Sequence, residues 1–219
     1  MNDPGLSDIN ARIVRCRECP RLVSYLADAK RRWPDHFCRP VPAWGDIVPR
    51  ILIVGLAPGL HGANRTGRLF TFDSSGQWLY GALHAAGLAS RPASVGPGDG
   101  LRLRSVYITS AARCAPPKNR PGTDELDRCR PYLREEISRL TTVRVAVALG
   151  RIAHDAVLKS LDLRPSAFPF AHGVQHRLAR FVLLDSYHCS RQNTNTGRLT
   201  RGMFRRIFER AKRLATLRG

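Results

Sequence analysis

Four of the six cysteines have a spacing that could bind a metal centre. Cys16 and Cys19 form a Cys-x-x-Cys pair, and Cys114 and Cys129 follow far downstream. A Cys-x-x-Cys pair can hold one metal centre between two thiolates, and two further thiolates complete a four-thiolate site. The spacing fits a zinc ion and an iron–sulfur cluster equally well. Unrelated buried thiols are the alternative, while disulfides are disfavoured in a reducing cytosol.

A single carboxylate stands out in the segment Ile51–Tyr80. Asp73 is the only acidic residue between Asp46 and Asp99, and arginines surround it in the sequence. Such an acid suits either chemistry or the capping of a helix. The glycine-rich stretch 55–62, GLAPGLHG, could bind phosphate, but it matches neither of the common nucleotide-binding fingerprints.

Three further residues have an ordinary explanation when each is taken alone. Phe70 is typical of a core residue, Asn119 of a turn between prolines, and His188 of a solvated loop. All three follow the ends of predicted strands, where open α/β sheets bind their ligands. An aromatic ring, an amide, a histidine and a carboxylate suit an enzyme that extrudes a base from a nucleic acid.

Alternating strands and helices must position these residues. The predicted strands cover 51–54, 106–110, 144–149 and 180–185, with a short edge strand near 174–178. The predicted helices cover 6–14, 22–32, 75–88, 123–140, 152–161 and a C-terminal segment after 199. Thr123 or Asp124 is expected to cap the fourth helix, and Pro131 to kink it. The pattern predicts a three-layer α/β/α sandwich with a central four-stranded, mostly parallel sheet.

The composition favours a nucleic-acid partner. The 219 residues, most simply one domain, carry 36 lysines and arginines against 17 acidic residues, a formal net charge of +19. This charge attracts polyanions, although genome composition could explain the preference for arginine over lysine. No apolar run is long enough to span a membrane, and no secretory segment is evident at the N-terminus. We therefore expect a cytoplasmic protein that is a monomer and does not bind membranes.

Two stretches of the sequence resemble a known family. They are GLAPG-x-x-G-x-N-R-T-G-R-x-F-T-x-D-x-S-G, which begins at Gly55, and the late loop YHCSRQN at 187–193. Both resemble the uracil-DNA glycosylase superfamily, and the cysteine pattern is similar to that of its iron–sulfur branches. Leu56 stands where family 4 carries an acid, as in family 5, the type-B enzymes of thermophiles and actinobacteria. The resemblance extends from Cys16 to Phe208.

The resemblance implies a role for each matching residue of the pocket. Phe70 would stack on the extruded base, Asn119 would hydrogen-bond its edge, and His188 would donate to its O2 atom. Asp73 would supply the polar catalytic group that Leu56 cannot. The backbone amides of Gly55, Leu56 and Ala57 would add hydrogen-bond donors.

The resemblance also implies contacts with DNA and a cofactor. A [4Fe–4S] cluster would be held by Cys16, Cys19, Cys114 and Cys129. The DNA minor groove would be contacted by Ser190, Arg191, Gln192 and Asn193. The sequence departs from the family pattern at three positions. Relatives often have glycine where this sequence has Phe72, and proline where it has Leu69. Many relatives also have proline where this sequence has Cys189.

The activity implied is that of a monofunctional uracil-DNA glycosylase in base excision repair. It would hydrolyse the N-glycosidic bond of uracil, and of other deaminated or modified bases, in double- and single-stranded DNA of a bacterium or archaeon. The first alternative is a non-enzymatic nucleic-acid-binding protein with a structural four-cysteine metal site. The second is an enzyme of the same fold that acts on free nucleosides.

Overall fold

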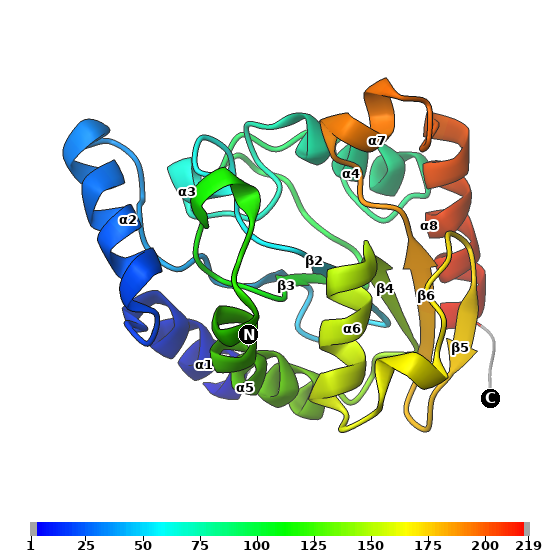
Figure 1. Ribbon diagram of the computed structural model, residues 1–219. Helices are drawn as coiled ribbons and strands as arrows, with labels where there is room; N and C mark the ends of the chain where they lie inside the picture. Colours follow the sequence, from blue (N-terminus) through cyan, green and yellow to red (C-terminus); the bar gives the residue numbers. More distant parts are fainter. Residues whose placement is uncertain (1–3, 217–219) are drawn as a thin grey trace.

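Six strands form one sheet at the centre of the molecule (Figure 1). The computed structural model describes residues 4–216. The four central strands run parallel to one another and are β2 (Ile51–Gly55), β3 (Val106–Ser110), β4 (Val145–Leu149) and β6 (Val182–Ser186). The order across the sheet is β1-β3-β2-β4-β6-β5. Every residue of β2, β3 and β4 is buried, which explains why these strands appear as unbroken apolar runs.

The four-stranded sheet of the prediction is wrong in its strand count, because two short strands extend the sheet at its edges. Both edge strands pair antiparallel with their neighbours. One is β5 (Gln175–Arg177), which lies within the predicted edge strand at 174–178. The other is β1 (Trp44–Gly45), in a segment for which the sequence predicted neither a strand nor a helix. Two residues give no sequence periodicity, so only the pairing with β3 reveals β1 as a strand.

Helices cover both faces of the sheet, as the predicted three layers require (Figure 1). The longer helices are α1 (Pro4–Arg15), α2 (Pro20–Arg32), α4 (Ser74–Ala85), α5 (Thr123–Arg139), α6 (Arg151–Ser160) and α8 (Arg201–Thr216). The short helices are α3 (Ala63–Thr66) and α7 (Arg191–Asn195), with 3-10 turns at Pro117–Asn119 and Pro165–Ala167. Neither short helix was predicted, since four or five residues show no helical repeat.

Alternate residues of each strand face opposite layers. Ile51 and Ile53 of β2 pack with α4 and α8, whereas Leu52 and Val54 pack with α1, α5 and α6. This alternation follows from the two-residue period of a strand. The three-layer α/β/α architecture is therefore confirmed.

The start of α5 differs from the prediction. The N-cap is Gly122, not Thr123 or Asp124, and its N–H donates to the Glu125 carboxylate at 2.7 Å. The helix continues through Pro131 instead of breaking there. Pro131 is exposed, so water can solvate the carbonyl group that its missing N–H leaves without a donor.

The parallel strands place their following loops along one edge of the sheet. The chain leaves β6 and reaches α7 beside the start of α4, as Figure 1 shows above the sheet. The loops after β2, β3, β4 and β6 therefore converge, which is where a ligand site is expected. No helix within residues 4–216 is long and apolar enough to cross a membrane.

Candidate active site

A small pocket at this edge of the sheet gathers the predicted catalytic and base-binding residues, with Asn119 outside its lining. The predicted residues that line it are Gly55, Leu56, Ala57, Phe70, Asp73 and His188. Gly59, Ala63, Leu69, Ser75 and Ser110 complete the lining. The loops after β2, β3 and β6 each contribute to it, so residues far apart in sequence meet here.

The Phe70 ring lies directly against Gly55. A Cβ atom at Gly55 would stand 2.8 Å from Phe70 Cζ, well inside van der Waals contact. Phe70 has a left-handed backbone with φ of 60°, a conformation that a bulky residue rarely adopts. Its neighbour Leu69 is fixed by Tyr80, whose hydroxyl donates to the Leu69 carbonyl at 2.7 Å. The ring is thus held rigidly across the end of β2.

Asp73 caps a helix, which is one of the two purposes that the sequence left open, and its second oxygen faces the pocket. Its Oδ1 accepts from the N–H of Gly76 at 2.7 Å and so caps α4. Its Oδ2 faces the loop after β2, since a Cβ atom at Gly62 would lie 2.8 Å from it. Burial raises the pKa of Asp73, while the Gly76 N–H and the charge of Arg191 oppose that rise. One oxygen is therefore occupied by the helix and the other is turned toward the pocket.

His188 is an uncharged imidazole at neutral pH. Burial lowers the pKa of His188 to about 4. Its backbone carbonyl accepts from Asn193 Nδ2 at 2.8 Å, which ties α7 to the histidine. A Cβ atom at Gly150, which has φ of 98°, would stand 3.3 Å from the His188 Cβ, so a side chain at residue 150 would crowd the histidine. A neutral imidazole can donate one hydrogen bond to a substrate.

The His188 loop is joined to the start of α4 by two reciprocal hydrogen bonds. Ser75 Oγ donates to the Cys189 carbonyl at 3.1 Å, and Cys189 Sγ donates to the Ser75 carbonyl at 3.5 Å. Cys189 is fully buried. Because Ser75 follows Asp73 by two positions, this link fixes the carboxylate and the imidazole relative to each other.

Asn119 lies at the rim of the pocket and is exposed. Its Oδ1 would lie 3.9 Å from a Cβ atom at Gly59, and Asp73 Oδ2 approaches the same point at 3.6 Å. Asn119 and Lys118 both have positive φ values, of 55° and 54°. Strained backbone of this kind clusters at functional sites.

A larger cavity of about 420 Å³ adjoins the pocket and shares Leu56 and His188 with it. The guanidinium of Arg198 lies 4.4 Å from the centre of the Tyr187 ring, and that of Arg151 lies 5.3 Å from the centre of Phe170. Further lining residues are Leu149, Gly150, Ile152, Ala171 and Asn193. Arginines beside aromatic rings suit a nucleic-acid strand, which presents phosphates and flat bases.

The predicted DNA-binding residues have different surroundings. Arg191 and Gln192 are exposed on α7, and Ser190 is its N-cap. Asn193 Nδ2 donates to the His188 carbonyl, so its amide positions the loop that carries His188. The proximity of Arg191 to the Asp73 carboxylate places α7 at the mouth of the pocket.

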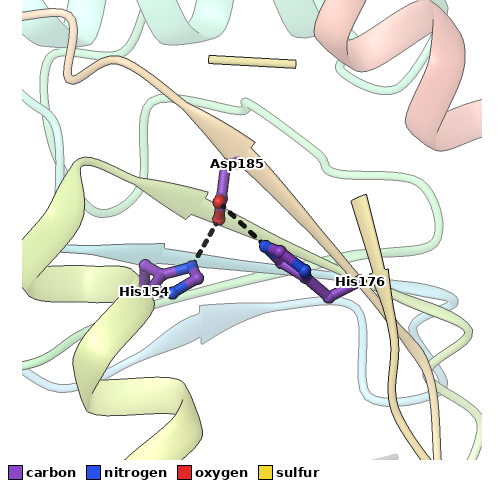
Figure 2. Close-up of side chains that lie close together, drawn as sticks. All are labelled: His154, His176 and Asp185. Carbon is purple, nitrogen blue, oxygen red and sulfur yellow. Dashed lines mark hydrogen bonds and ion pairs between the residues drawn. The ribbon is translucent and has the colours of Figure 1, made fainter. Parts of the chain in front are cut away.

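A buried network that the sequence analysis missed supports the end of β6. Asp185 lies between two histidines, with its Oδ1 2.7 Å from His154 Nδ1 and its Oδ2 3.6 Å from His176 Nε2 (Figure 2). His154 Nε2 donates to the Phe168 carbonyl at 2.8 Å. Both ring nitrogens of His154 are thus engaged in hydrogen bonds, and we interpret the group as a support for the loop that carries His188. His154 and His176 were missed because nothing in their spacing links them to Asp185.

The four predicted metal-binding cysteines line one cavity between α2 and α5. They are Cys16, Cys19, Cys114 and Cys129. Within residues 4–216, only one group of three potential metal ligands has its ligand atoms within 4.8 Å of one another. That group is His154, His176 and Asp185, and it contains none of the cysteines. No three of the four sulfur atoms therefore lie within 4.8 Å of one another. Burial raises the pKa of the Cys19, Cys114 and Cys129 thiols.

A buried ion pair supports this cavity from the side of the sheet. Arg113 precedes Cys114 and donates to Glu136 Oε2 on α5 at 2.6 Å. Both side chains are almost completely buried. Arg113 also bonds Thr109 of β3, so the pair fixes the loop that carries Cys114.

Comparison with known proteins identifies the family. The family model described as the uracil DNA glycosylase superfamily matches residues 42–212. A type-5 uracil-DNA glycosylase of Thermus thermophilus is 54% identical over 211 residues, which cover 94% of this chain and 96% of that protein. The corresponding enzyme of Pyrobaculum aerophilum is 48% identical, with 93% of this chain and 91% of that protein covered.

A type-4 uracil-DNA glycosylase of Pyrobaculum aerophilum is more distant, at 31% identity over 73% of this chain and 67% of that protein. The stronger similarity to type-5 enzymes agrees with Leu56 at the position after the first glycine of the pocket. The chain therefore belongs to the uracil-DNA glycosylase superfamily, within its type-5 branch.

Proposed function

We propose that this protein is a monofunctional DNA repair glycosylase that extrudes uracil from DNA and hydrolyses its N-glycosidic bond, leaving an abasic site. The observation that carries the proposal is the meeting of Phe70, Asp73 and a neutral His188 in one pocket of a strongly basic protein. A protein that only binds DNA has no need of a partly buried carboxylate among arginines. The activity of the type-5 relatives supports the same conclusion.

The extruded base stacks on Phe70, and Asn119 at the rim bonds its edge. An amide offers both a donor and an acceptor, which suits the adjacent O4 and N3–H of uracil. The Phe70 ring lies against Gly55, and the Tyr80 hydroxyl fixes the Leu69 carbonyl just before it, so we expect stacking to need little rearrangement of the protein. Preorganisation of this kind lowers the cost of binding an extruded base.

Bond cleavage develops negative charge on uracil and positive charge on the sugar. The neutral His188 donates to O2 of the departing uracil anion, and the backbone amides of Leu56 and Ala57, which line the same pocket, assist it. Fixed donors in a closed site stabilise such an anion without reorganisation, and loss of one typically costs about 2.7–4 kcal/mol in the barrier. The Asp73 carboxylate stabilises the sugar cation and orients the attacking water through the oxygen that the helix leaves available.

The apolar Leu56 is expected to broaden the range of substrates. Leu56 stands where family 4 has an acid, so the pocket has no polar side chain at this position. Base selection therefore rests on stacking and on the contacts that Asn119 and His188 make with the edge of the base. We propose that deaminated purines and modified pyrimidines are also released. Excision assays across uracil, hypoxanthine and modified pyrimidines measure this range directly.

The DNA strand enters through the basic and aromatic cavity beside His188, in both double- and single-stranded substrates. Arg151 and Arg198 there face the phosphates, and Arg191 and Gln192 of α7 approach the position that the base has left. Each neutralised phosphate steepens the loss of affinity with salt by about 0.9 in the log–log slope. We expect steep salt dependence for a protein of this charge.

The four cysteines fit a [4Fe–4S] cluster better than a zinc ion. Thiolates bound to one tetrahedral zinc lie roughly 3.8 Å apart, given a Zn–S distance of about 2.3 Å. No three of the four sulfur atoms here lie within 4.8 Å of one another, an arrangement that suits thiolates binding different irons of a cluster. The raised thiol pKa values also call for a cation that favours thiolates. The cluster would join α2 and α5 to the Cys114 loop and carry no catalytic step.

The activity is tested with uracil-containing DNA, in both single- and double-stranded form, incubated with the protein and then treated with alkali. Strand cleavage at uracil, and none at thymine, is expected. His188→Ala is expected to slow release at least tenfold while DNA binding survives. Absence of cleavage in both DNA forms would refute the proposed function.

The cofactor is tested separately by metal analysis and visible absorbance. We expect a brown protein with iron and sulfide, loss of colour in Cys114→Ser, and retained colour in Cys38→Ser. Cys38 serves as the control because it is buried but lies outside the four-cysteine cavity. A colourless protein with stoichiometric zinc would exclude the cluster.

A further inference from the structure

An exposed aromatic residue with a strained backbone lies next to the catalytic carboxylate. Phe72 is 51% exposed and has φ of 55°. A left-handed backbone is unfavourable for a bulky residue and easy for glycine. A ring that is half in solvent contributes little to the core in return. Phe72 therefore needs an explanation other than folding stability.

The strain arises from the neighbours of Phe72. Phe70 and Asp73 both line the pocket, and Thr71 between them is fully buried. Thr71 Oγ1 donates to the Arg68 carbonyl at 2.9 Å and lies 2.5 Å from Thr66 Oγ1. With these three residues held inward, residue 72 must turn the chain and point its side chain out. The turn requires the backbone conformation, but it does not require a phenyl ring.

Arg65 lies over this ring. Its guanidinium carbon is 4.4 Å from the centre of the Phe72 ring, and both side chains are exposed. Arg65 belongs to α3, which is anchored by Asn64, a fully buried residue that donates to the Arg39 carbonyl at 2.8 Å. Phe72 and Arg65 thus form a fixed flat surface at the mouth of the pocket, which we call the stacking platform.

A flat aromatic and guanidinium surface is what proteins use to bind unpaired bases. Resting on the glycosylase function proposed above, we propose that the stacking platform binds the DNA strand beside the extruded nucleotide, by stacking of a neighbouring base on Phe72. The platform adjoins Asp73, and Arg191 approaches Asp73 from α7, so both sides of the pocket mouth carry positive charge. A second copy of this chain is disfavoured as the occupant, because it brings the same net charge of +19.

Phe72→Gly tests the platform because it should affect stability and DNA binding differently. We expect a melting temperature no lower than that of the wild type, since glycine relieves the backbone strain. Affinity for an oligonucleotide should fall by about 5- to 150-fold, the range for loss of one stacked base. Phe72→Trp should restore affinity. Val48→Ala is the matched control, since Val48 is 59% exposed and lies before the opposite end of β2.

The oligonucleotide carries 2′-fluoro-deoxyuridine, whose fluorine disfavours the sugar cation and so prevents cleavage. A fluorescent 2-aminopurine is placed on one side of this nucleotide or on the other. Stacking on Phe72 should dim the probe on one side only, and the Phe72→Gly protein should leave it brighter. A merely structural role for Phe72 would not change this signal.

Unchanged affinity in Phe72→Gly, or a lower melting temperature, would overturn the proposal. Self-association of the wild type that Phe72→Gly abolishes, at unchanged DNA affinity, would assign the platform to a second copy instead. Because the oligonucleotide is not cleaved, the comparison of affinities decides the role of Phe72 even if the wild type releases no uracil. Failure of the proposed activity is thus seen separately, in the excision assay.

Discussion

The two oxygens of Asp73 have different partners, and substitutions at this position can separate their effects. Oδ1 caps α4 through the Gly76 N–H at 2.7 Å, whereas Oδ2 faces the loop after β2. Asparagine and serine cap helices about as well as aspartate, but alanine does not. We therefore expect the stabilities of Asp73→Asn and Asp73→Ser to stay near that of the wild type. Asp73→Ala should lose about 1 kcal/mol.

The expected magnitudes follow from the surroundings of the carboxylate. For a chain of this length, about 1 kcal/mol corresponds to a fall of roughly 2–4 °C in melting temperature. Burial raises the pKa of Asp73, so the ionised carboxylate destabilises the folded protein at neutral pH. Asp73→Asn removes that charge while it keeps the cap, and it should melt no lower than the wild type. Its uracil release should be slower by about 10²-fold, the usual effect of one lost electrostatic contact in a closed site.

Single-turnover release of uracil and thermal melting, measured on all three variants, provide the test. Activity should fall in every variant, while stability should fall in Asp73→Ala alone. If Asp73→Asn released uracil at the wild-type rate, the carboxylate would be a cap and nothing more. If Asp73→Asn melted as low as Asp73→Ala, the separation of the two oxygens would be wrong.

Four further predictions concern other parts of the protein. Gly55→Ala should displace the Phe70 ring by roughly 1 Å and lower kcat/KM for uracil release by about 10²-fold. As a control, Gly81→Ala in α4 should leave kcat/KM unchanged in the same excision assay. Because burial lowers the pKa of His188 from 6.5 to about 4, we expect no loss of activity near pH 6.5 in a pH–rate profile. The same shift should destabilise the fold as pH falls from about 6.5 to 4, by about 3 kcal/mol in denaturant titrations. Arg113→Met should cost about 3–5 kcal/mol in such a titration, because it leaves the Glu136 carboxylate buried without its partner.

The central architecture could be predicted because local sequence determines it. The four parallel strands are apolar runs bounded by glycine, proline or polar residues, and each predicted helix before or after them was found. The convergence of the loops follows from the parallel order alone, since such strands must end at one edge. This is why Phe70, Asp73 and His188 could be assigned to one pocket without coordinates.

Features that depend on contacts distant in sequence could not be predicted. The hydrogen bonds between Ser75 and Cys189 join positions 114 residues apart, and no periodicity in the sequence predicts them. The network of His154, His176 and Asp185 also joins separate elements, and β1 exists only through its pairing with β3. Asn193 was assigned to DNA because its position matched a family motif, but its amide bonds the His188 carbonyl.

Left-handed residues are concentrated around the pocket, although Cys38, Ser105 and Asp162 elsewhere also have positive φ values. Phe70, Phe72, Lys118 and Asn119 all have positive φ, and all lie in the two loops that surround Asp73. In each loop the chain must present side chains to a pocket while buried or proline-fixed neighbours hold it, so the backbone takes a conformation that its residues disfavour. Sequence propensity favours glycine or asparagine at such positions and therefore gives no sign of an aromatic residue there. The strain becomes evident only when the pocket is seen, and it underlies the proposal that Phe72, which the sequence showed only as a departure from the family pattern, contacts the DNA.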